Sequence, residues 1–189
     1  MQKLPEILKI AEAEAAPMGL TVVETRFSQQ GKRRTLEVTI CRKGGRVSLD
    51  DCEELSRRLD QTLEELTPPL IEGSYMLEVQ SPGLERQLKS EREFEIFSGE
   101  QVEVKTKEAV SALGDTFTGM LQSLSGGVLT IREPQPVKQP VLSRKKANKT
   151  SSETAAQIPE LISLEWSKVL RVRLHALDPD KSDTAPNYN

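Results

Sequence analysis

The sequence predicts an α+β protein in which an N-terminal αββαβ unit is followed by a small β-barrel of the SH3 or Sm type. In the first part of the chain, apolar residues follow helix and strand spacing in the order helix, strand, strand, helix, strand. In the second part, five short β segments fall within about 75 residues. We therefore expect a three-stranded sheet covered by two helices, and a separate barrel after it.

The first helix is expected over residues 3–16, where apolar residues recur at helical spacing until Pro17. The strand after it alternates in polarity, and one of its faces is expected to carry Thr21, Val23, Thr25 and Phe27. A hairpin loop at residues 29–32 leads to a returning strand. The apolar face of that strand carries Leu36, Val38 and Ile40.

The second helix opens at Ser48, and Asp51 three residues later completes a start that resembles a capping box. An apolar stripe follows along it: Cys52, Leu55, Leu59, Leu63 and Leu66. Pro68-Pro69 ends the helix. In the third strand, one face is expected to carry Tyr75, Leu77 and Val79, and the other Met76, Glu78 and Gln80. This first unit is expected to occupy residues 1–88.

The third strand breaks at Pro82-Gly83. Proline at the second position of a turn fixes φ, and glycine at the third accepts the positive φ of a type II turn. Glu85 and Arg86 follow at once, with charges of both signs. A rigid turn of this kind suits recognition, and it equally suits a plain junction between two domains.

A linker with a short helix is expected over residues 89–99, since Ser90 and Glu93 form a capping box and Gly99 stands where a helix C-cap belongs. The barrel should then occupy residues 100–176. Its strands are expected at 102–104, 116–121, 128–131, 161–164 and 170–174.

Two segments have too little apolar content to offset the entropy of ordering. Residues 133–157 combine prolines with the basic run Arg144-Lys145-Lys146, and we expect a disordered basic insertion between strands. Residues 177–189 are expected to form a disordered tail.

The bulk composition narrows the class of protein. Of the 189 residues, 36% are apolar and 29% charged, and no apolar run approaches the roughly 18 residues that span a bilayer. The start of the chain lacks the apolar core of a signal peptide, so we expect a cytoplasmic protein without a membrane partner. The cysteines Cys41 and Cys52 have neither a disulfide framework nor zinc-ligand spacing.

The sequence contains no constellation that is typical of catalysis. The single histidine, His175, follows the last strand without an acidic or nucleophilic neighbour. Acidic residues at the start of the second helix favour the helix dipole, which is sufficient reason for their presence. There is no phosphate-binding glycine loop. We therefore expect no enzymatic activity, no cofactor and no metal.

Local positive charge is more suggestive than the formal net charge of −3, because phosphate contacts depend on local charge. Arg171 and Arg173 alternate with apolar residues, so both guanidiniums should lie on one barrel face, as in any half-exposed strand. Aromatic residues are 4% of the chain, so contacts to RNA would be to phosphate and shape. A basic protein that meets acidic residues such as Glu78 and Glu85 is an alternative partner.

The segment Tyr75–Leu88 closely resembles the signature of the bacterial ribosome maturation factor family RimP, Tyr-x-Leu-Glu-Val-Ser-Ser-Pro-Gly-Leu-Asp-Arg-Pro-Leu. The similarity covers about residues 1–175 and thins towards the C-terminus. Further upstream it includes residues 18–20, 36–40 and 47–57. Three positions differ from the signature: Gln80, Glu85 and Gln87.

The resemblance implies a KH-like or ferredoxin-like first unit and an SH3-like barrel. It also implies a non-enzymatic role in maturation of the small (30S) ribosomal subunit, with binding to pre-30S particles through ribosomal protein S12 and/or 16S rRNA. We expect a monomer. The contacts would lie at Ser81, Pro82, Gly83, Leu84, Glu85 and Arg86, and secondarily at Arg171 and Arg173. The alternative is an Sm-like RNA-binding regulator that acts on transcripts outside the ribosome.

Overall fold

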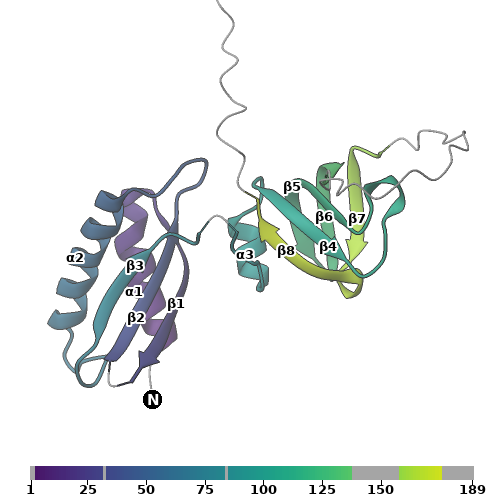
Figure 1. Ribbon diagram of the computed structural model, residues 1–189. Helices are drawn as coiled ribbons and strands as arrows, with labels where there is room; N and C mark the ends of the chain where they lie inside the picture. Colours follow the sequence, from purple (N-terminus) through teal and green to yellow (C-terminus); the bar gives the residue numbers. More distant parts are fainter. Residues whose placement is uncertain (1–2, 32, 84, 138–157, 176–189) are drawn as a thin grey trace, which may run out of the picture. The chain divides into compact units, whose positions relative to one another are not determined.

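The computed structural model of the chain describes residues 3–31, 33–83, 85–137 and 158–175. The chain divides into two compact units, residues 1–83 and 84–189 (Figure 1). The predicted α+β class is confirmed: the first unit combines helices with a three-stranded sheet, and the second holds a five-stranded antiparallel sheet. Leu84, the expected tail and most of the expected basic insertion lie outside the described residues.

The first unit has the expected order of elements. They are α1 (Leu4–Ala15), η1 (Ala16–Met18), β1 (Thr21–Gln30), β2 (Arg33–Cys41), α2 (Leu49–Glu65) and β3 (Met76–Gln80). β2 is the central strand, antiparallel to β1 and parallel to β3. A parallel pair requires a crossover connection, which α2 supplies. Both helices cover the same face of the sheet, where their apolar side chains meet those of the strands.

The start of α2 confirms the predicted capping box. Ser48 Oγ accepts a hydrogen bond from the Asp51 amide at 3.0 Å, and the Asp51 carboxylate accepts one from the Ser48 amide at 2.9 Å. Each side chain satisfies a backbone donor that the helix leaves free. From this start, Leu55, Leu59 and Leu63 follow at helical spacing and are buried against the sheet.

β1 departs from simple alternation at its beginning. Val22 pairs with Ile40, but Glu24 pairs with Thr39, so Val23 is the extra residue of a bulge. Directly paired residues lie on one face, which places Val22 on the helix-covered face with Ile40. The face predicted for Thr21 and Val23 is therefore wrong. A bulge reverses the faces of all residues on one side of it, and polarity alone does not reveal it.

The second unit begins at Leu84, ahead of the boundary at Leu88 that the sequence indicates. Its elements are α3 (Glu91–Ile96), β4 (Gln101–Thr106), η2 (Ser111–Leu113), β5 (Thr116–Ser125), β6 (Val128–Pro136), β7 (Leu161–Glu165), η3 (Trp166–Lys168) and β8 (Val169–Leu174). The strand order is β7-β6-β5-β4-β8. β6 is longer than expected, and residues 133–136 are strand because β5 continues to pair there, with Phe117 opposite Pro136.

α3 and the residues before it pack with the second unit. Leu88, Phe94 and Phe97 are buried, and the capping box of Ser90 with Glu93 is present as predicted. The helix ends at Ile96 with Phe97 as its C-cap, so the C-cap predicted at Gly99 is two positions late. Phe97 already closes the last turn, because its own amide donates back to the Glu93 carbonyl.

Candidate functional site

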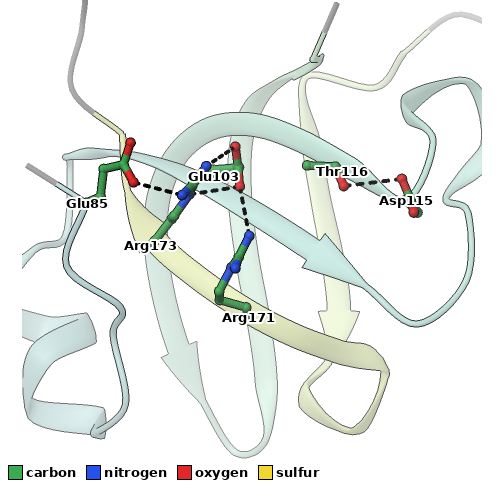
Figure 2. A network of polar contacts seen from close by, with 6 residues as sticks. All are labelled: Glu85, Glu103, Asp115, Thr116, Arg171 and Arg173. Carbon is green, nitrogen blue, oxygen red and sulfur yellow. Dashed lines mark hydrogen bonds and ion pairs between the residues drawn. The ribbon is translucent and has the colours of Figure 1, made fainter. Parts of the chain in front are cut away.

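A network of charged residues lies on the outward face of β4 and β8 (Figure 2). In the antiparallel register Glu103 stands opposite Arg173, and Lys105 stands opposite Arg171. Residues that oppose one another across a ladder share a face. Arg171 and Arg173 therefore lie on one face, as their alternation in the sequence predicts, and β4 brings a carboxylate and an amine to the same place.

Glu103 is the centre of this network. Its carboxylate accepts hydrogen bonds from Arg173 Nε at 2.9 Å and from Arg173 Nη2 at 3.0 Å, which is the bidentate arrangement of an arginine fork. Arg171 Nη2 approaches the same carboxylate at 3.5 Å. Burial raises the pKa of Glu103, but Arg173, Arg171 and His175 outweigh burial and hold that pKa below its usual range. Glu103 is therefore ionised at neutral pH.

Arg173 holds a second carboxylate on its other side. Its Nη1 donates to Glu85 Oε2 at 2.9 Å. The side chain of Glu85 is 72% exposed, whereas that of Arg173 is 28% exposed. One guanidinium thus connects a buried carboxylate with a solvated one. The hydrogen bonds to Glu103 raise the pKa of Arg173 further above its already high value.

Arg86 points to a different partner. Its Nε and Nη2 donate to Glu93 Oε1 at 2.8 and 2.7 Å, and its side chain is only 17% exposed. The Glu93 carboxylate also accepts the amides of Lys89 at 2.7 Å and Ser90 at 3.0 Å. Burial raises the pKa of Glu93, yet these donors outweigh burial and lower it. Arg86 therefore connects the segment after the turn to the first turn of α3.

The backbone of this segment is joined to β8. The Leu88 amide donates to the Val172 carbonyl at 2.9 Å, and the Leu174 amide donates to the Arg86 carbonyl at 2.9 Å. Gln87 and Arg173 form an antiparallel bridge between these two bonds. The segment thus satisfies backbone groups of β8 that a bare strand edge would leave open.

The structure divides the predicted site residues between the two units. Ser81, Pro82 and Gly83 end the first unit, and Gly83 has the positive φ, +72°, that the predicted turn requires. The second unit brings three of the others together, Glu85, Arg171 and Arg173, whereas the side chain of Arg86 pairs with Glu93. Leu84 is outside the described residues.

The first unit has a smaller network of the same kind, on the sheet face away from α1 and α2. Glu37 in β2 stands opposite Arg26 in β1 and binds Arg26 Nε at 2.7 Å. Gln80 Nε2 of β3 approaches the same carboxylate at 3.5 Å. Hydrogen bonds from Ser28 and Arg26 lower the pKa of Glu37. This buried carboxylate holds the three strands in register.

Metal-ligating side chains do not gather anywhere in the described part of the chain, in groups of three or more. Asp51, at the acidic start of α2, is used by the capping box and by an ion pair of 2.8 Å with Arg42. Among the helices that the structure describes, none combines the length and apolar character needed to cross a bilayer.

Comparison with known proteins places the chain in a family. Residues 10–85 match the RimP N-terminal domain. Ribosome maturation factor RimP of Rippkaea orientalis (strain PCC 8801 / RF-1) is 42% identical over 104 residues, which are 55% of this chain and 67% of that protein. The chain belongs to the RimP family. The resemblance carried by Tyr75–Leu88 is thereby confirmed.

In this member of the RimP family, sequence reasoning missed the carboxylates that organise the arginines. Glu103, Glu93 and Glu37 each hold an arginine, and each is nearly buried. Glu103 stands between Val102 and Val104, both of which are buried, so its outward position could have been deduced. The pairing of β4 with β8 determines the partner of Glu103. More than 60 residues of chain separate these two strands, so the pairing leaves no local signal in the sequence.

Proposed function

We propose that this RimP family member is a non-enzymatic ribosome maturation factor that acts in the cytoplasm on the small (30S) subunit. Family membership is the observation that carries the proposal, since the relative from Rippkaea orientalis bears the name ribosome maturation factor. A surface of paired arginines and glutamates supports a binding role, because guanidinium groups bind phosphate and carboxylate with defined geometry.

The proposed partner is a pre-30S particle. The chain would bind it as a monomer, through ribosomal protein S12 and/or 16S rRNA. Two surfaces are the proposed contacts. One is the outward face of β4 and β8 with Arg171 and Arg173, where cations share a face with a single buried carboxylate, Glu103. The other is the turn at Ser81, Pro82 and Gly83, in which Ser81 and Gly83 are exposed.

We further propose that the second unit is an SH3-like barrel and the first a KH-like or ferredoxin-like domain. The strand order β7-β6-β5-β4-β8 and the register shifts within β5 and β8 support the barrel, because such irregularities bend strands towards closure. On this assignment residues 89–99 are a linker with a short helix, α3, and the buried Phe94 and Phe97 pack it with the second unit.

Deletion of the gene in its own host tests the function. We expect sucrose gradients of the deletion strain to show accumulated immature 30S subunits, and the tagged wild-type protein to sediment with those particles. Normal subunit profiles would overturn the proposal. Crosslinking followed by RNA sequencing tests the partner: a majority of messenger or small-RNA reads would instead indicate an Sm-like regulator outside the ribosome.

The turn has a test of its own. Pro82→Ala removes the restraint on φ and should weaken sedimentation with pre-30S particles several-fold while circular dichroism stays native. Pro69→Ala is the matched control, because Pro69 is an exposed proline of the same unit that lies outside the turn. Equal sedimentation of both variants would limit Pro82 to chain reversal.

A further inference from the structure

We propose that Glu85 is an internal competitor for RNA: in the free chain it occupies Nη1 of Arg173, and an RNA phosphate replaces it when the chain binds. This rests on the proposed function, because 16S rRNA is the partner whose phosphates would take that position.

Arg173 uses different nitrogen atoms to bind Glu103 and Glu85. Nε and Nη2 both donate to Glu103, at 2.9 and 3.0 Å, and this pair of bonds fixes the plane of the guanidinium. Nη1 belongs to the remaining edge of the same plane, and it donates to Glu85 at 2.9 Å. Glu103 therefore keeps the guanidinium aimed in one direction whether or not Glu85 is bound.

The exposure of the two carboxylates decides which of them can leave. The side chain of Glu103 is 9% exposed, and removing a buried partner from an ion pair is strongly unfavourable. The side chain of Glu85 is 72% exposed, and an ion pair with such a partner contributes little in water. A phosphate oxygen, which is also an anionic acceptor, can replace Glu85 at Nη1 without disturbing Glu103.

The neighbouring charges favour a polyanion over a single carboxylate. Lys105 stands opposite Arg171 in the ladder, and both are next to the pair of Glu103 with Arg173 on the same face. Three cations thus share that face with one buried carboxylate, and the ion pair with Glu85 neutralises part of the excess positive charge. A row of cations at cross-strand spacing matches the repeated charge of a nucleic-acid strand.

Arg171 also has capacity to bind. Its side chain is 41% exposed, and its approach to Glu103 is long, at 3.5 Å. Its Nε is buried without a hydrogen-bond partner among the described residues. This guanidinium is therefore less committed to Glu103 than that of Arg173, and we assign it the second phosphate contact.

Fluorescence anisotropy with the full chain and a fluorescein-labelled 16S rRNA transcript tests the proposal. We expect Glu85→Gln to tighten binding about two- to fivefold, the range set by an exposed ion pair. Glu100→Gln is the matched control, because Glu100 is an exposed glutamate of the same unit and its loss changes the net charge equally. Arg171→Gln should weaken binding and reduce the salt dependence by about one phosphate contact.

Equal effects of Glu85→Gln and Glu100→Gln would overturn the proposal, since net charge alone would then account for them. The same variants titrated with poly-glutamate distinguish a protein partner. If Glu85→Gln strengthens binding of poly-glutamate but leaves RNA binding unchanged, the face takes carboxylates and the RNA proposal is wrong. Sedimentation of the wild-type chain with pre-30S particles reports separately on the proposed function, so the two failures are distinguishable.

Discussion

The sheets of the two units each bury one glutamate on their polar face, but they use it differently. Glu37 in β2 and Glu103 in β4 are almost equally buried, and each binds the arginine that stands opposite it in the ladder. Glu37 has one arginine, Arg26, and otherwise neutral donors. Glu103 has two arginines, and one of them also holds the exposed Glu85.

A buried carboxylate can contribute to a protein surface in two ways. Around Glu37 the carboxylates outnumber the single arginine, because Arg26 also lies 4.0 Å from Glu24 and Glu78 stands opposite Glu37. This network links the three strands. Around Glu103 the cations outnumber the buried carboxylate, so the carboxylate holds guanidiniums in a fixed orientation at the surface. An arginine restrained in this way loses less conformational entropy when it binds an anion than a free one does.

Removal of Arg173 should have the largest effect on stability. Arg173→Ala leaves Glu103 buried with only the long contact to Arg171, and we expect a loss of about 3 kcal/mol in the free energy of unfolding. Urea unfolding monitored by the fluorescence of Trp166, the single tryptophan, reports on the second unit. The double variant Glu103→Gln/Arg173→Gln should recover part of the loss. A loss below about 1 kcal/mol would mean that the pair is solvated.

Arg86→Ala should lower the free energy of unfolding by less, about 2 kcal/mol, because Glu93 retains the amides of Lys89 and Ser90 as hydrogen-bond donors. The same fluorescence measurement applies, since Trp166 contacts Phe94 of α3 at 5.4 Å between ring centroids. Lys89→Ala is the control, because it removes an exposed cation of the same segment and leaves the backbone amide that donates to Glu93. Unchanged stability would show that Arg86 is not needed to hold α3.

The sequence predicts elements of this chain better than their partners. Capping at Ser48 and Ser90 and the apolar stripe of α2 are local patterns, and each appears as predicted. The bulge at Val23 is one extra residue in an otherwise regular alternation, so periodicity conceals it. The charge of Arg86 is visible in the sequence and predicts a contact with a partner, whereas its ion pair with Glu93 depends on how the chain enters α3.

Arg26→Ala should have a smaller effect than either change in the second unit. Arg26 is 61% exposed, and Glu37 keeps Gln80 and Ser28 as partners, so we expect about 1 kcal/mol. Far-ultraviolet circular dichroism at the helical band reports on the first unit, which contains the two longest helices of the described residues. An effect as large as that of Arg173→Ala would contradict the contrast between the two glutamates.

The two glutamates also predict how stability depends on pH. The pKa of Glu103 is lowered in the folded chain, so its contribution is present above the ordinary glutamate pKa of about 4.3 and is lost as the pH falls through the lower folded value. The stability difference between wild type and Glu103→Gln should therefore shrink below about pH 4.3, because the carboxylate becomes protonated and resembles the amide. The pKa of Glu37 is lowered as well, because Ser28 and Arg26 donate hydrogen bonds to it, so the difference between wild type and Glu37→Gln should shrink over the same pH range. Urea midpoints measured at a series of pH values give both differences, and a difference that stays constant for Glu103→Gln would show that the ionised form of Glu103 is not the one that holds Arg173.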